Sequence, residues 1–512
     1  MQKKLLAVAV LSAFSGLAAA QSANVTLYGT LIGDWQMASA TGADSSTTAG
    51  TNSSVRTAAS LTTNPTNNTS RSRTNPAGSN FGLRGTEDLG NGLSAWFQLE
   101  LSATLGAPSG VPDGANHGNA VSYRNSAVGL RSNTWGSLSV GMWDTPFNVM
   151  QGANNINGRF LNATTGTGAN MLGATILGNG AWSGQNEFAT CTPGTGTAVV
   201  GAGPSGGSAC LNAGTNFDRR QKFITQWWSP NWNGFESRVA YSGVQFADNA
   251  TTSNVGAASA FSAPNMRPAI WDISLAYTNG ALNVSYAYER QKDLLAYALY
   301  TAQNGASAAG GIPGIGLIGG GNGTGAWTTG SSTAAAATAA VGTYNASGSA
   351  GTGHRLGARY KFTGIGPGSI GVGAMWESLK YDLSYSLIGG PAAAGNVALL
   401  SQLKKTAYRL QGNYEWGSHL IGLDYTRANR LQGSISNTTA AGTGAWDSSG
   451  TGSRAWVLGY SYNLSKRTSL MGYYMNVRNE SNSNTGGSTF APITAGAGAT
   501  VQYYGMSVRH AF

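Results

Sequence analysis

Segments of about ten residues in which apolar and polar side chains alternate recur along almost the whole chain. In the first of them, Val25, Leu27 and Trp35 share one face, while Asp34 and Gln36 share the other. A period of two indicates a β-strand whose two faces meet different surroundings. About ten residues is also the length that a tilted strand needs to cross a bilayer. A slip of one residue would turn every polar side chain to the apolar side, so the register is strongly specified.

Short turns and long loops alternate between these segments. Asn279-Gly280 is the clearest hairpin turn, and six others are expected at residues 88–91, 132–136, 230–234, 364–368, 416–418 and 464–466. Eight long connections rich in Gly, Ser, Thr, Asn and Ala cover residues 39–71, 106–118, 147–217, 247–267, 294–351, 384–401, 431–453 and 481–499. Seven hairpins and two single segments, at residues 25–37 and 500–512, make sixteen strands. We therefore predict an all-β fold, a sixteen-stranded antiparallel transmembrane β-barrel with long external loops.

The composition agrees with a membrane barrel and not with a soluble protein of this length. Charged residues make up 10% of the 512 residues, and 75 residues are glycine, whereas about 25% charge is usual in soluble domains. The mean hydropathy is only −0.15. Because a barrel strand needs apolar residues at alternate positions only, its average hydropathy stays near neutral.

The first twenty residues have the pattern of a secretory signal. Lys3 and Lys4 precede an apolar run over residues 5–17, and small residues end at Ala20. The run is shorter than the roughly 20 residues that a membrane-spanning helix needs. We expect residues 1–20 to be a signal peptide that is removed on export, and residues 21–512 to form one barrel domain.

The charge balance and the motif content disfavour several classes of function. The net charge of +10 includes Lys3 and Lys4, so the chain from Gln21 carries +8. No basic cluster interleaved with aromatic residues is evident, so nucleic acid is not an expected partner, and a mild preference for anions in a pore is the better interpretation. No Walker loop, dinucleotide-binding fingerprint or H-E-x-x-H motif occurs, and none of the four histidines is expected to face inward beside a serine and an acid. We expect no catalytic residue, no cofactor and no metal site.

Four segments of the chain resemble a known family. These are residues 25–29 (VTLYG), 81–93 (FGLRGTEDLGNGL), 459–468 (GYSYNLSKRT) and 505–512 (GMSVRHAF). They resemble the general Gram-negative porins of the betaproteobacterial type, a family of trimeric, sixteen-stranded outer-membrane channels. The resemblance implies passive diffusion of small hydrophilic solutes and ions through a water-filled pore. It also implies a homotrimer in outer-membrane lipid and lipopolysaccharide.

The last strand carries a second expectation. Its alternating stripe ends on Phe512, and a terminal strand of this kind resembles the signal read by the barrel-assembly machinery of the outer membrane. Any final strand of a barrel would show a similar stripe, so a purely structural role stays open.

The resemblance also implies where the pore is narrowest. In the family the third external loop folds into the pore, and here that loop is residues 147–217. Arg84 and Arg124 match positions of the family's basic wall, whereas Asn80 and Met142 stand where the family commonly has arginines. The constriction should therefore be less basic than is usual. Other expected pore-lining residues are Arg71, Arg73, Asp34 and Glu100, with Glu187 as the loop carboxylate that faces the arginines.

The two cysteines of the chain, Cys191 and Cys210, both lie in this third loop. A single pair in an exported chain suggests a disulfide, which would stabilise the loop by roughly 3 kcal/mol. A metal-bound pair is the weaker alternative, since no second pair of ligands is spaced nearby.

Two further functions stay open at this point. Aromatic residues near strand ends fit interfacial girdles, and these are Trp35, Trp228, Trp376, Trp416, Trp456 and Tyr503. A substrate-specific channel would instead need aromatic side chains along the lumen. No such run is evident, although Trp96 and Trp182 keep the option open. The long loops could also serve a surface adhesin or receptor.

Overall fold

The structure is a computed structural model of the chain. It describes residues 24–42, 69–75, 78–103, 121–158, 171–172, 217–243, 269–292, 350–382, 398–430, 432–437, 450–480, 483 and 498–512. The expected signal peptide, residues 1–20, lies outside these ranges. The described residues form nineteen strand segments and one helix, α3 (Pro146–Ala153). The strands are β1 (Asn24–Thr41), β2 (Thr69–Asn75), β3 (Asn80–Gly90), β4 (Leu93–Ala103), β5 (Val121–Tyr123), β6 (Ser126–Ser132), β7 (Gly136–Asp144), β8 (Arg220–Trp228), β9 (Phe235–Gly243), β10 (Ala269–Asn279), β11 (Leu282–Lys292), β12 (Ala350–Ile365), β13 (Gly368–Asp382), β14 (Ala398–Trp416), β15 (His419–Ala428), β16 (Gln432–Asn437), β17 (Ser453–Asn463), β18 (Thr468–Asn479) and β19 (Thr500–Ala511).

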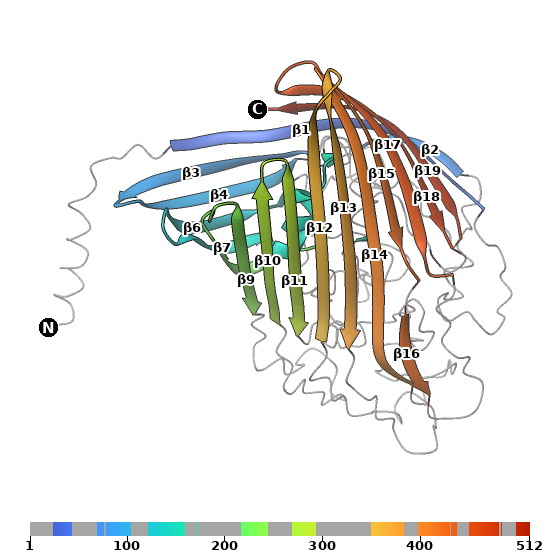
Figure 1. The fold of residues 1–512 in the computed structure, drawn as a ribbon, viewed down its shortest axis with the longest axis horizontal. Helices are drawn as coiled ribbons and strands as arrows, with labels where there is room; N and C mark the ends of the chain where they lie inside the picture. Colours follow the sequence, from blue (N-terminus) through green and yellow to red (C-terminus); the bar gives the residue numbers. More distant parts are fainter. Residues whose placement is uncertain are drawn as a thin grey trace.

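All of these segments belong to one antiparallel sheet, in which neighbours in sequence are neighbours in space (Figure 1). β1 pairs with β3 along one edge and with β19 along the other, so the sheet closes on itself. Three strands are interrupted: β2 and β3 share β1, β5 and β6 share β4, and β15 and β16 share β14. The nineteen segments therefore form sixteen strands. The predicted closed, sixteen-stranded antiparallel barrel is confirmed.

The seven predicted short turns are also confirmed. They connect β3 to β4, β6 to β7, β8 to β9, β10 to β11, β12 to β13, β14 to β15 and β17 to β18. Gly280 adopts a φ of 56° in the Asn279-Gly280 turn, a backbone conformation that glycine enters without a steric penalty. Each of these turns joins two antiparallel strands at one end of the barrel, so the opposite ends of the same strands lead into the long loops.

Apolar side chains cover the outside of the barrel. On β17, Trp456 and Leu458 are 45% and 47% exposed, while Ala455 and Val457, which alternate with them, are buried. A soluble protein would not expose a continuous apolar band of this kind, whereas lipid requires it. Trp35, Trp376 and Trp456 are exposed on this outer surface, as girdle residues would be. No helix among the residues that the structure describes has the length and hydropathy of a membrane-spanning helix.

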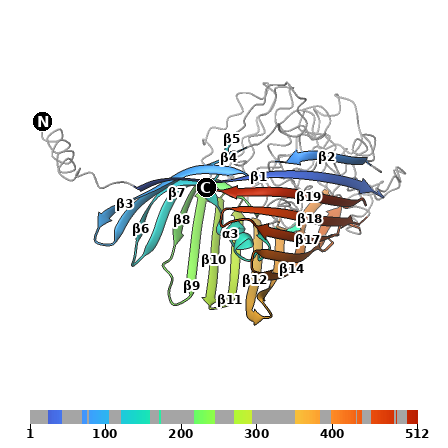
Figure 2. The same cartoon turned by 90° about the horizontal axis from the view of Figure 1, so that it is seen from above.

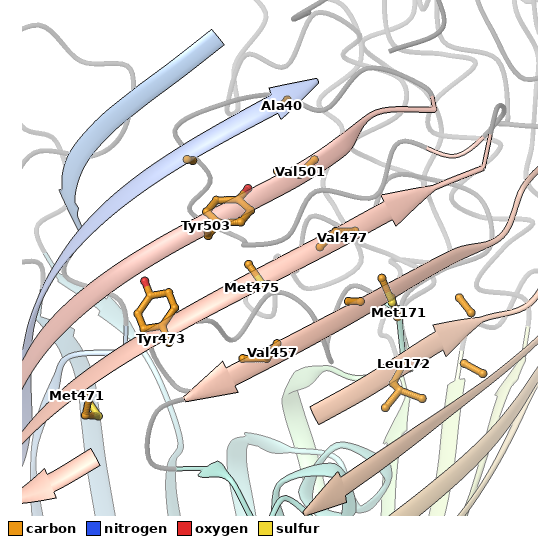
Figure 3. Packing of buried hydrophobic residues seen from close by; sticks show 14 of the residues in the cluster. Ala40, Met171, Leu172, Val457, Met471, Tyr473, Met475, Val477, Val501 and Tyr503 are labelled. Atoms are coloured by element: carbon orange, nitrogen blue, oxygen red, sulfur yellow. The ribbon is translucent and has the colours of Figure 1, made fainter. Parts of the chain in front are cut away.

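Part of the inner face is apolar and covered (Figure 3). Met475, Val501 and Tyr503 belong to a buried cluster that also contains Met171 and Leu172, two fully buried residues of the third long connection. Tyr503 is 1% exposed and stands opposite the buried Ala38. The prediction that Tyr503 lies in a girdle is therefore wrong, because its register turns the side chain to the inside of the barrel.

Candidate pore lining and constriction

One group of charged side chains lines the inner wall formed by β1, β3 and β4. Glu100 joins two neighbours, because its carboxylate accepts a hydrogen bond from the Tyr28 hydroxyl at 3.0 Å and forms an ion pair with Arg124 Nε at 2.5 Å. The Arg84 guanidinium lies 5.1 Å from the centre of the Tyr28 ring. The structure thus brings together Arg84, Arg124 and Glu100, three of the residues that the sequence predicted to line the pore.

A second charged group continues the same wall toward β7 and β8. Arg220 Nε lies 3.1 Å from Asp144 Oδ1 and donates to Asn125 Oδ1 at 2.6 Å. Asn125 in turn donates from Nδ2 to Asp144 Oδ2 at 2.9 Å. Arg124 and Arg220 are therefore each neutralised by a carboxylate. Arg84 differs, because no carboxylate in the described ranges lies within ion-pair distance of it.

The chain leaves the wall directly after this group and enters the barrel as helix α3 (Figure 2). Thr145 caps the helix by accepting a hydrogen bond from the Asn148 backbone N–H at 3.4 Å, and Pro146 occupies the first turn, where its missing N–H costs nothing. Strands β10 and β12, farther round the barrel wall from β7, then hold the backbone of Phe147. Its N–H donates to Asp272 Oδ2 at 2.9 Å, and its carbonyl accepts from Arg355 Nη1 at 2.7 Å.

The residues after the helix continue along the inner wall, to strands that lie farther round the barrel. Asn154 Nδ2 donates to Ser285 Oγ on β11 at 2.6 Å. Asn157 Nδ2 donates to the backbone carbonyls of Gly412 on β14 and Leu423 on β15, at 3.4 and 3.1 Å. Asn154 and Asn157 are both buried, so their side chains contact these strands from the inside of the barrel and not from its outer surface. The described start of the third loop is thus attached to wall strands β10 to β15.

A buried ionic network supports this attachment. Arg355 Nη1 lies 2.6 Å from Asp218 Oδ1, and the guanidinium also pairs with Glu377; these three side chains are at most 1% exposed. The guanidinium centre lies 4.0 Å from the centre of the Phe147 ring. Burial raises the pKa of the Asp218 carboxyl to about 7, although the neighbouring Arg355 opposes the rise. Such a network is costly to break, because removal of one partner leaves an uncompensated buried charge.

Three tryptophans form an aromatic cluster on the inner wall. The ring centres of Trp96, Trp143 and Trp228 are 5.3 to 5.8 Å apart. Arg131 lies over Trp96 at 5.7 Å and Arg238 lies over Trp228 at 4.9 Å.

The prediction that Trp228 belongs to a girdle is therefore wrong. Its side chain shares a face with the buried Gln226, to which its indole N–H donates at 2.8 Å, and the exposed Phe223 and Thr225 occupy the opposite face. The alternation of side chains along β8 decides this orientation, and the position of Trp228 near the end of the strand does not. Inward aromatic side chains, which the sequence did not reveal as a run, come from three separate strands.

The remaining predicted residues are spread over the barrel. Asp34 is 2% exposed and accepts a hydrogen bond from the Tyr473 hydroxyl at 2.9 Å, away from the arginines of the wall. Arg71 and Arg73 lie in β2, in register with Ala38 and Gln36. The backbone of Phe512 exchanges hydrogen bonds with Gly29. Glu187, Cys191 and Cys210 lie outside the described residues.

Sequence reasoning missed several residues of this region. Arg220 and Arg355 were not singled out for the constriction, because their partners are far away in sequence. Asp144 and Asn154 were likewise passed over. One signal was available: Thr145-Pro146 directly after a strand is the pattern of a helix start, and it predicts that the third loop begins with a helix.

Comparisons with known proteins give consistent matches. The model of the Gram-negative porin family matches residues 7–311 and 293–482. An outer membrane porin protein of Bordetella pertussis is 29% identical over 300 residues, which cover 57% of this chain and 60% of that protein, so the match spans less than two thirds of the relative's length.

Solved structures share the fold at low sequence identity. The anion-selective porin from Comamonas acidovorans superposes with a TM-score of 0.52 at 18% identity, covering 96% of this chain and 100% of that one. Outer-membrane expressed OmpT of Vibrio cholerae gives a TM-score of 0.51 at 11% identity, covering 96% and 99%.

Proposed function

Since this chain belongs to the Gram-negative porin family, we propose that it forms a water-filled channel through which small hydrophilic solutes and ions diffuse across the outer membrane. It is an outer-membrane protein, as its family and its relative in Bordetella pertussis are. Porins are channels and not enzymes, so an enzymatic function is set aside. A barrel of sixteen strands is wide enough to hold water, so selectivity depends on what narrows it.

One observation carries the proposal: the chain leaves β7 at Asp144, is held by β10 and β12 at Phe147, and reaches β14 and β15 at Asn157, on the side of the barrel opposite β7. Arg84 and Arg124 stand on the wall that the chain leaves behind. This arrangement supports a pore that is narrowed by the third loop, with basic side chains on one side of the passage. Residues 147–217 would supply the other side, with Glu187 as the proposed facing carboxylate.

The same wall supports a mild preference for anions. Arg124 and Arg220 are paired with Glu100 and Asp144, whereas Arg84 has no carboxylate partner among the described residues. Arg131 and Arg238, beside the inner tryptophans, also lack an ion pair within the described ranges. Asn80 and Met142, which replace arginines common in the family, add no charge. The field of a few unpaired cations biases ion passage without excluding cations.

Several properties of the mature protein remain part of the proposal. We infer removal of residues 1–20 on export, insertion by the barrel-assembly machinery with Phe512 as part of the signal, and a homotrimer in a leaflet that contains lipopolysaccharide. Arg71 and Arg73 are proposed to line the outer vestibule, and Cys191 and Cys210 are proposed to form a disulfide. Family membership and the apolar outer surface support these inferences.

Planar-bilayer recording of the purified protein tests the proposal. We expect stepwise, ohmic conductance, in groups of three equal steps for a trimer, and a reversal potential on the anion side in a salt gradient. A folded, heat-modifiable barrel that never conducts would refute the channel. A cation-side reversal potential would refute the proposed role of Arg84.

A substrate-specific channel is the second candidate, and the cluster of Trp96, Trp143 and Trp228 favours it. Flat aromatic side chains beside Arg131 and Arg238 would suit solutes that combine a flat ring with a negative charge. Benzoate at millimolar concentration should then block the current of small ions, whereas acetate should not. Equal currents with both anions would leave the general pore as the better description.

A further inference from the structure

Three arginines stand side by side at the loop end of neighbouring strands. In the antiparallel register Arg427 of β15 is opposite Arg454 of β17, and Arg454 is opposite Arg478 of β18. Each is the residue next to the end of its strand, at the end where the long loops begin. Directly opposed residues have their Cβ atoms about 5 Å apart, and like charges in such pairs are destabilising. We call this row the arginine ladder.

The ladder lies on the outer surface of the barrel. Two residues farther into the strand, Trp456 is 45% exposed on the same face as Arg454, and Tyr425 lies on the same face as Arg427. The Tyr425 and Trp456 rings are 4.3 Å apart at their centres. Aromatic pairs of this kind mark the boundary between hydrocarbon and headgroups. The ladder is therefore at the height of the lipid headgroups, on adjacent orange and red strands of Figure 1.

Negative side chains do not neutralise the ladder. Among the residues that the structure describes, none of the three arginines has a carboxylate within ion-pair distance. The nearest acid in sequence, Glu480, is already paired with Arg430 at 2.7 Å. Between residues 425 and 500 the sequence holds only Asp447 and Glu480 as acids. Within the described part of the chain, no negative side chain balances the positive charge of the ladder.

We propose that the arginine ladder binds the phosphate groups of lipid A, the lipid anchor of lipopolysaccharide in the outer leaflet. Guanidinium groups bind phosphate through paired, charge-assisted hydrogen bonds. A headgroup with two phosphates fits a row of three cations, while its acyl chains would pack on Trp456 and the apolar strand face below. This site rests on the proposed function only in requiring that the barrel spans the outer membrane.

Lipid binding by the full-length purified barrel in detergent tests the site. The probe is diphosphoryl lipid A, and the variant is Arg427→Gln with Arg454→Gln and Arg478→Gln. We expect the apparent Kd of the variant to rise at least tenfold, and we expect monophosphoryl lipid A to bind the wild type several-fold more weakly than the diphosphoryl form. Inorganic phosphate should not compete at equal concentration, because it lacks the acyl chains.

A matched control removes exposed arginines elsewhere, as Arg290→Gln with Arg467→Gln, and should keep wild-type affinity. Heat-modifiable migration establishes that each variant is folded, and Arg454→Lys, which retains the charge, should retain most of the affinity. Unchanged lipid A binding in the folded triple variant would overturn the proposal. Loss of oligomers in lipid-free detergent with unchanged lipid binding would also overturn it and identify a contact between copies. Conductance of the triple variant should stay normal, so failure of the channel and failure of the lipid site are separable.

Discussion

Gly29 and Phe512 join the two ends of the barrel wall at the seam between β1 and the residue that follows β19. The Gly29 N–H donates to the Phe512 carbonyl at 3.1 Å, and the Phe512 N–H donates to the Gly29 carbonyl at 3.0 Å. The Phe512 ring covers the glycine so closely that a Cβ atom there would stand 2.5 Å from Cζ of the ring and 2.7 Å from the Asn80 carbonyl oxygen. Closure of the barrel at this point depends on a residue without a side chain.

Gly29→Val should therefore destabilise the folded barrel by about 1–3 kcal/mol, the usual cost of overpacking. Urea unfolding in detergent micelles measures the change. Gly33→Val on the same strand is the matched control, because a Cβ at Gly33 meets nothing within 4 Å. Equal stability of the two variants would mean that the ring of Phe512 does not constrain the seam.

Removal of the Arg355 side chain should weaken the attachment of α3. Arg355→Met leaves Asp218 and Glu377 as buried carboxylates without their cation and removes the donor to the Phe147 carbonyl. We expect a loss of about 3–5 kcal/mol in the free energy of unfolding and noisier single-channel currents. Arg359→Met, on the same strand but exposed, should change neither. A quiet, stable Arg355→Met channel would contradict the role given to this network.

The Asp218 carboxyl predicts a specific pH dependence of stability. Its pKa is raised from 3.8 to about 7 in the folded protein, so the folded state holds the proton more tightly than the unfolded chain does. Its stabilising contribution is complete below pH 3.8 and is lost as pH rises through about 7.

Asp218→Asn should remove this dependence. Urea unfolding of wild type and variant at about pH 5 and about pH 8 measures the difference in slope. Wild-type stability should fall toward the higher pH relative to the variant. Asp88→Asn, at the exposed end of β3, should behave as wild type. Parallel curves for wild type and Asp218→Asn would contradict the assignment.

Ion selectivity should respond to Arg84. A unit charge about 5 Å from the ion path is worth about 0.8 kcal/mol in water, or roughly a fourfold change in the partition of each ion, in opposite directions for anions and cations. Arg84→Gln should therefore shift the reversal potential toward the cation side. Glu100→Gln should shift it the other way, because Arg124 then loses its carboxylate partner. Substitution of Lys361, which is exposed and paired with Glu415, should have a smaller effect than either.

The cysteine pair is tested chemically. Alkylation of the unfolded protein without reductant should modify neither Cys191 nor Cys210, and reduction should expose both thiols. Reduction should also lower the free energy of unfolding by about 3 kcal/mol. Alkylation of both residues before reduction would exclude the disulfide.

The strands and short turns were predictable from sequence because each depends on residues close together in the chain. Alternation along residues 25–36 specifies which side chains face lipid, and Asn279-Gly280 specifies a tight hairpin. Trp228 and Tyr503 were assigned wrongly, because position near a strand end was given more weight than parity. Arg84, Arg124 and Glu100 were predicted to line the pore, and the structure brings them together on one wall.

By itself, the sequence determined the barrel: period-two patterning, seven turn signals and an even strand count leave few other ways to satisfy the backbone in lipid. Tertiary structure decided which charges meet. Arg355 lies 137 residues from Asp218 in the chain, Asn157 reaches Leu423, and Arg427, Arg454 and Arg478 form a row only once β15, β17 and β18 are paired. Contacts across the barrel and between strands depend on barrel closure and on strand register together. The local sequence pattern does not specify which distant residue becomes the partner.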